Sequence, residues 1–175
     1  MMNDRIATRA VCRFWLLIVL ALATSPVRAA VLDDSDASRL AAINEAIKSF
    51  EDDVSSALHD LPSNEAEQIE SYAYVELNLE AAHERMNTVF MLTAVSVYVE
   101  SPSDRLLILN LMHGQLLPQS KNYLNEKRNA IASMAAAHPA NRVLATYGTR
   151  AAALLADRAI PLLDELYRRT GDPAP

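Results

Sequence analysis

Cysteine and glycine are the residues that this 175-residue chain most clearly lacks, with one of the first and three of the second. The single cysteine, Cys12, leaves no partner for an intramolecular disulfide. It also precedes the apolar segment of the N-terminus, so it cannot be the lipid-bearing cysteine that follows such a segment in a lipoprotein. Glycine is scarce, alanine and leucine are abundant, and β-branched runs are almost absent, a composition that favours helix throughout.

The N-terminus has the layout of a secretory signal peptide. Three arginines precede an apolar core over 14–23, and small side chains follow it up to a predicted cut before Ala30. The core of about ten residues is shorter than the roughly 20 that a membrane-spanning helix needs. We therefore expect residues 1–29 to be a cleaved signal peptide. Residues 30–175 should form one helical domain, periplasmic or secreted, with no stable membrane insertion.

Charge is distributed unevenly along the expected mature chain. Residues 30–100 carry 15 acidic side chains against three basic ones, whereas residues 101–175 carry six against nine. This balance argues against nucleic acid and anionic lipid as partners. One interpretation is that the acidic half faces the basic half in the fold. The other is that a cationic protein partner binds acids around the first interhelix turn, namely Glu51, Asp52, Asp53, Glu65, Glu67 and Glu70.

Prolines divide the mature chain at similar intervals, each where a helix should start or stop. These are Pro62, Pro102 and Pro139. They delimit four predicted helices, over roughly 35–61, 64–100, 102–137 and 140–170. Pro118 and Pro161 fall inside the third and fourth helices. We expect a kink near each rather than an end, because apolar periodicity resumes beyond both.

Apolar side chains recur in steps of three and four along the first and fourth predicted helices, the pattern of bundle packing. In the first helix they are Leu40, Ile43, Ile47, Phe50, Val54, Ala57 and Leu61. In the fourth they are Leu144, Tyr147, Ala151, Leu155, Ala159, Leu162 and Leu166. Short connections favour antiparallel neighbours, so the predicted fold is an all-α, antiparallel up-down four-helix bundle. A stack of helical repeats ranks lower because the units share no residues in register.

The second interhelix turn is unusually apolar. Residues 93–99 alternate like a strand, but no other segment could pair with them, so we assign them to the end of the second helix. Residues 106–109 continue the apolar run on the other side of the turn. The simplest interpretation is burial by the start of the first helix and the end of the fourth. The alternative is an oligomer contact or an apolar ligand pocket.

Metal chemistry receives little support from the sequence. Glu80 and His83 have the Glu-x-x-His spacing of di-iron bundles, but the counterpart at Asn110 and His113 lacks its carboxylate. If the second and third helices fold back at Pro102, the two histidines lie about 14 Å apart along the bundle. We therefore reject a di-iron centre. His83 is expected on the shoulder of the core, bonded to one of its polar neighbours, Asn122, Tyr123 or Glu80.

Cofactor and enzyme motifs are absent from the sequence. No Cys-x-x-Cys-His is present for covalent haem, and the chain has no nucleophile elbow, zinc helix or glycine-rich phosphate loop. We expect no cofactor and no catalytic residue. If a small apolar ligand, haem or metal were bound, the candidate residues would be Glu80, His83, Met112 and His113.

The predicted function is that of a small exported, non-catalytic α-helical protein that binds a protein partner through its acidic face. A helical bundle that holds a small apolar ligand or cofactor is the second hypothesis. The third is a hydrolase whose site matches none of the familiar motifs.

Overall fold

The computed structural model describes residues 32–62 and 65–171, and every regular element within these ranges is helical. The first and second helices are α2 (Asp34–His59) and α3 (Ala66–Tyr98). The third consists of α4 (Pro102–Leu111), η1 (Met112–Leu116) and α5 (Leu117–Ala137). The fourth consists of η2 (Leu144–Gly148), α6 (Thr149–Leu154), η3 (Leu155–Ala159) and α7 (Ile160–Gly171). The all-helical prediction with four helices is confirmed. The segment predicted as a signal peptide lies outside the described residues.

Helix starts follow local capping rules. The Asp33 carboxylate accepts hydrogen bonds from the backbone N–H groups of Ser35 and Asp36, and the Asp36 carboxylate accepts one from Asp33 N–H. This reciprocal pair is a capping box, which satisfies N–H groups that the first turn of α2 would otherwise leave unpaired. At α4, Ser101 caps a helix whose first residue is Pro102.

The two internal prolines do not end their helices. Each is preceded by a wider π-helical turn, in which Leu117 N–H donates to Met112 O before Pro118, and Ile160 N–H donates to Leu155 O before Pro161. A proline ring clashes with the carbonyl of the residue four positions before it. In both cases that residue is the middle one of the π-helical turn. A π-helical turn therefore precedes each of these prolines, and the kink expected near each stays a prediction. A third such turn, η2, contains no proline and was not predicted.

Apolar side chains from all four helices form the core. In α2, Leu40, Ile47 and Val54 are fully buried, and Ile43 and Phe50 nearly so. The α3 side chains that face them are Val75, Leu79, Ala82, Met86 and Val89, all with no exposed surface. The third helix contributes Met112, Leu117, Leu124 and Ile131, and the fourth contributes Leu144, Ala151, Leu155, Ala159, Leu163 and Leu166. The predicted apolar seams are thus largely buried, although Ala57 and Leu61 at the end of the first are only half-buried.

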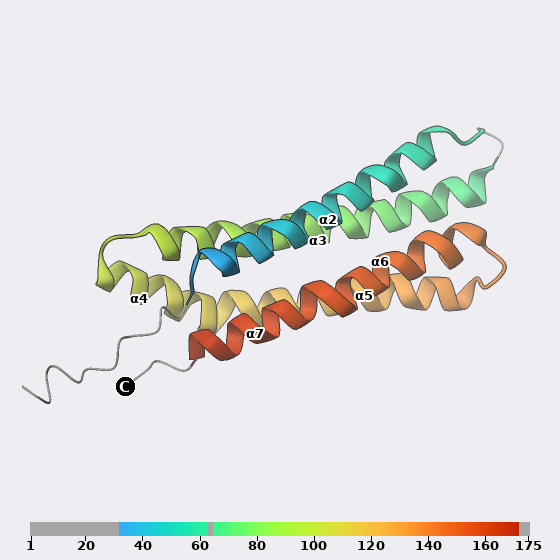
Figure 1. Cartoon of the computed structure of the whole chain (residues 1–175). Coiled ribbons are helices and arrows are strands. Elements are labelled where there is room, and N and C mark those ends of the chain that lie inside the picture. Colours follow the sequence, from blue (N-terminus) through green and yellow to red (C-terminus); the bar gives the residue numbers. More distant parts are fainter. Residues whose placement is uncertain (1–31, 63–64, 172–175) are drawn as a thin grey trace, which may run out of the picture. The chain divides into compact units, whose positions relative to one another are not determined.

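Neighbouring helices lie along one another in Figure 1, with α2 beside α3 and α5 beside α6 and α7. Contacts between neighbours run in opposite order along the chain. Asn44 contacts Asn87 and Glu51 lies near His83, while Phe50 stacks on Tyr147. The backbone of α2 follows α3 closely but approaches the fourth helix much less. This difference leaves an open seam between α2 and the fourth helix.

Among the described residues, no helix combines the length and the apolar character that a membrane crossing requires. The longest, α3, has 33 residues but carries charged side chains between Glu67 and Arg85.

Candidate interaction surface

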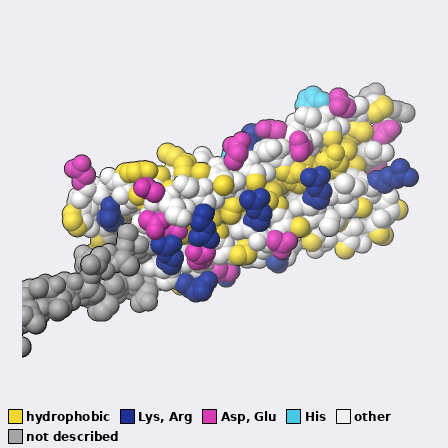
Figure 2. Space-filling model, in the orientation of Figure 1, with side chains coloured by type: hydrophobic (Ala, Val, Ile, Leu, Met, Phe, Trp, Pro, Cys, Tyr) yellow, Lys and Arg dark blue, Asp and Glu magenta, His cyan; other side chains and the backbone are white. Residues whose placement is uncertain are grey.

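Large apolar side chains are exposed at the end of α3 and on α4. The described chain exposes eight large hydrophobic residues, and six of them lie here. They are therefore clustered rather than scattered over the surface. We call this set the apolar surface: Met91, Val95, Tyr98, Leu106, Leu107 and Leu111. Tyr98 is 71% exposed and Leu107 is 68% exposed. In Figure 2, hydrophobic side chains are visible over the C-terminal part of α3.

The expectation that this turn is buried was wrong for α4, Val95 and Tyr98, although Thr93 and Ser96 are buried. The fourth helix ends at Gly171, whose Cα lies against the imidazole of His113, so it stops level with η1 and does not reach α4. At the start of α2 the neighbour is polar instead. The Tyr98 hydroxyl donates a hydrogen bond to the Asp34 carboxylate, and this bond raises the pKa of the hydroxyl. As a result, α4 contains no buried residue.

The turn that carries the apolar surface is fixed by polar contacts. The Arg105 guanidinium donates to the carbonyl oxygens of Val97 at 2.8 Å and Val99 at 3.3 Å. Val97 lies in the last turn of α3 and Val99 is its C-cap residue, so the cation also complements the helix dipole. These two bonds therefore join the start of α4 to the end of α3 within the turn.

His113 covers the end of α7. Its ring stacks on Tyr167 with centroids 4.4 Å apart, and its Nδ1 lies 3.2 Å from Tyr167 O. A Cβ at Gly171 would come within 2.2 Å of this ring. Gly171 has no left-handed backbone conformation, so glycine is required here for close approach to His113. His113 therefore packs against the fourth helix.

The predicted acidic face is not a single exposed set. Glu51 is buried, and Lys48 Nζ binds both Glu51 and Asp52 at 2.9 Å. Glu51 points toward α3, where His83 Nδ1 is 4.0 Å from its carboxylate, whereas Asp53 lines the seam facing the fourth helix. The remaining members, Glu65, Glu67 and Glu70, follow the first interhelix turn and are half-buried or exposed.

The two charged halves of the chain meet at one place among the described residues. Arg169 contacts the buried Asp36 and the partly exposed Asp33. Nearby, Arg39 of the acidic half forms a bidentate pair with Glu165 of the basic half, with N–O distances of 2.7 and 2.6 Å. General pairing of the acidic half with the basic half is therefore not observed in the described chain.

The residues proposed for an apolar ligand or cofactor are not brought together. His83 lies on the shoulder of the core, as expected, but its acidic neighbour is Glu51 of α2. His113 faces α7, Met112 is buried and Glu80 is exposed. Within the described ranges, no group of three or more His, Cys, Asp or Glu side chains could hold a metal ion.

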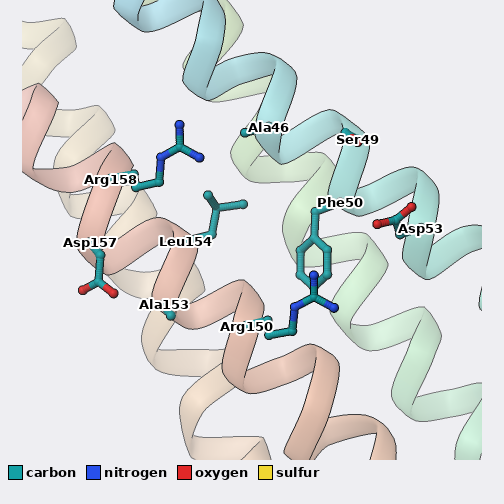
Figure 3. A pocket seen from close by; sticks show the side chains of 9 residues that line it. All are labelled: Ala46, Ser49, Phe50, Asp53, Arg150, Ala153, Leu154, Asp157 and Arg158. Carbon is teal, nitrogen blue, oxygen red and sulfur yellow. The ribbon is translucent and has the colours of Figure 1, made fainter.

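Sequence reasoning missed a groove between α2 and the fourth helix, with a volume of about 500 Å³. Figure 3 shows Arg150, Leu154 and Arg158 extending from the fourth helix toward Ala46 and Phe50 of α2. The three are spaced by four residues and so form one stripe on a helix. The sequence shows this spacing and the short side chains on α2, but neither determines how closely the two helices approach.

Comparison with protein-family models, with curated proteins and with solved structures finds no match to this chain. The assignment of function therefore depends on the contacts and exposures described above.

Proposed function

We propose that this chain is an exported, non-catalytic helical protein that acts by protein–protein interaction. The signal-peptide layout before Ala30 supports export. The opposite order of contacts along neighbouring helices supports an antiparallel up-down four-helix bundle as its fold. Such a bundle gives a rigid scaffold on which an exposed surface can be presented.

The observation that carries the proposal is the apolar surface at the end of α3 and on α4. Exposed apolar side chains lose contact with water when they meet another apolar surface, and this loss is favourable. The partner should therefore be apolar itself, and a second copy of this chain supplies such a surface. Two copies would meet around a two-fold axis, with the same residues contributed by each.

Sedimentation velocity of the mature chain, from low to high micromolar concentration, tests this proposal. We expect a shift from monomer to dimer as the concentration rises. Leu107→Lys should abolish the shift because it places a charge in the contact. Leu77→Lys is the matched control, since Leu77 is also exposed on α3 but lies outside the apolar surface. A wild-type chain that stays monomeric, or equal effects of both variants, would contradict the proposal.

A cationic protein partner is a second candidate, which the exposed acids of the first interhelix turn favour. Asp53, Glu67 and Glu70 are exposed, and none of them has a basic partner within 4 Å among the described residues. Charges of this kind raise the rate and specificity of association. They also lie at the opposite end of α3 from the apolar surface, so the two surfaces can be tested separately.

Charge reversal distinguishes this second candidate. Asp53, Glu65, Glu67 and Glu70 would be changed to lysine, leaving Glu51 and Asp52 intact because they bind Lys48. A partner captured from the exported fraction at low salt should be lost both at high salt and with the reversed variant. Retention of the same partner by the reversed variant would exclude the acidic surface.

A further inference from the structure

We propose that the groove between α2 and the fourth helix binds a single-chain amphipathic anion, with a carboxylate head group and an alkyl tail. This site lies apart from the apolar surface and does not depend on the proposed dimer, although Asp53 belongs both to its lining and to the acids of the second candidate. Arg158 would bind the head group, and Leu154 with the alanines Ala46 and Ala153 would receive the tail. The volume of about 500 Å³ falls within the range of small-molecule sites.

The groove exists because its two walls carry short side chains where they face each other. Ala46 and Ser49 line it on α2, and Ala153 lines it on the fourth helix. The walls are bridged on one side by the Arg39–Glu165 pair and on the other by the Phe50–Tyr147 stack, with ring centroids 6.1 Å apart. These bridges span the seam, so the short side chains between them leave space rather than closing it.

Apolar surface is available inside the groove. Figure 2 shows a strip of hydrophobic side chains along the seam between α2 and the fourth helix, with Lys and Arg side chains beside it. Figure 3 shows that Leu154 extends across the gap toward α2. An alkyl chain lying along the half-buried Leu154 and the alanines Ala46 and Ala153 would remove apolar surface from water, which favours binding in proportion to the area covered.

Two arginines and two aspartates line the groove, and their positions would place the head group of an anion. Arg158 has no carboxylate within 4 Å among the described residues, unlike Arg39 and Arg169 in the same seam. Asp157 points away from the gap in Figure 3, and Asp53 lies at the Phe50 end, away from Arg158.

Arg150 has a different role at the Phe50 end. Its guanidinium lies over the Phe50 ring, 4.8 Å from the centroid. This cation–π contact already occupies the face of Arg150. Arg158 has no such contact among the described residues, so we assign the head group to Arg158.

Titration calorimetry of the mature chain with laurate, kept below its micelle concentration, tests the site. We expect saturable binding of one laurate per chain, with Arg158→Gln weakening it by about tenfold or more because a charged hydrogen-bond donor is removed. Arg142→Gln is the matched control, since Arg142 is an exposed arginine outside the groove. Dodecyltrimethylammonium, which has the same tail and a cationic head group, should not bind there.

Filling the groove gives a second, independent measurement. Ser49→Leu should abolish laurate binding while the helical circular dichroism and thermal transition stay close to wild type, because Ser49 is exposed. Leu107→Lys should leave laurate binding unchanged, since that residue belongs to the apolar surface. Equal affinity of wild type and Arg158→Gln, equal binding of the cationic amphiphile, or loss of binding in Leu107→Lys would each overturn the proposal.

Discussion

The third helix has two parts that differ sharply in burial. In α5, Leu117, Leu124 and Ile131 are almost completely buried, whereas α4 has no buried residue although half of its ten residues are leucine or isoleucine. The two parts are joined by η1 and belong to one continuous helix. Burial here depends on neighbours: α5 lies beside both α3 and the fourth helix, and α4 extends beyond Gly171, where the fourth helix ends.

This difference shows that the apolar content of a helix does not by itself identify core residues. An apolar residue lowers the free energy of folding only when another element removes it from water. In α4 the required neighbour is absent from the described chain, which leaves its leucines available for a partner. The predictions below test this contrast and the contacts that set its boundary.

Matched leucine substitutions test the contrast with the largest expected effect. Leu124→Ala should lower the free energy of unfolding by about 2–5 kcal/mol, because Leu124 has no exposed surface and truncation leaves a cavity. Leu107→Ala should change it by less than about 0.5 kcal/mol, measured at a concentration where the chain is monomeric. Chemical denaturation of both variants measures the difference. Similar losses for the two leucines would show that α4 contributes to the core.

Arg169 tests how the end of the fourth helix is anchored to the start of α2. Its guanidinium binds Asp36, a carboxylate with no exposed surface. Arg169→Gln should cost about 2–3 kcal/mol, less than a fully buried pair because Arg169 is itself one-third exposed. Arg168→Gln is the control, since Arg168 is exposed and, among the described residues, donates its hydrogen bond to a backbone carbonyl of its own helix. Equal thermal shifts for the two variants would contradict this anchoring role.

Gly171 marks the last contact of the fourth helix before α4 extends alone. Gly171→Ala should lower the free energy of unfolding by about 1–2 kcal/mol, because the added Cβ would overlap the His113 ring. The effect should shrink in a His113→Ala background, which removes the overlap. A double-mutant cycle with no coupling between the two positions would show that the ring does not limit this site.

The Arg39–Glu165 pair should have the smallest effect because both side chains are partly exposed. Arg39→Gln should cost about 0.2–1 kcal/mol at neutral pH. The bond to Arg39 lowers the pKa of Glu165 below its ordinary value of 4.5, so the pair stabilises the fold above that pH. Its contribution is lost as the pH falls through the lowered pKa. The gap between wild type and Arg39→Gln should therefore narrow in acid; a gap that widens below pH 4.5 would contradict this.

Much of the fold was predictable because it depends on local signals. Steps of three and four identified the buried side of α2 and of the fourth helix, and Ser101 with Pro102 identified the start of α4. The register proposed for the second and third helices also agrees with the structure, since Arg85 donates to Ser120 across them at 2.9 Å.

The candidate surfaces were harder to predict because they depend on where distant elements end. The apolar turn was expected to be buried, and nothing local to residues 93–109 indicates that the fourth helix stops level with His113. Glu51 was grouped with exposed acids, although its position on α2 turns it toward α3 and Lys48. The groove depends on how closely two helices approach across a seam, which residue spacing within each helix does not determine.

Hydrogen exchange measured at two protein concentrations tests the central claim most directly. At low concentration, backbone amides of α4 should exchange much faster than those of α5, because burial does not stabilise α4. At high concentration, amides between Met91 and Leu111 should become protected while those of α5 stay unchanged. Protection of α4 equal to that of α5 at low concentration, with no dependence on concentration, would contradict the assignment of this surface to a second copy of the chain.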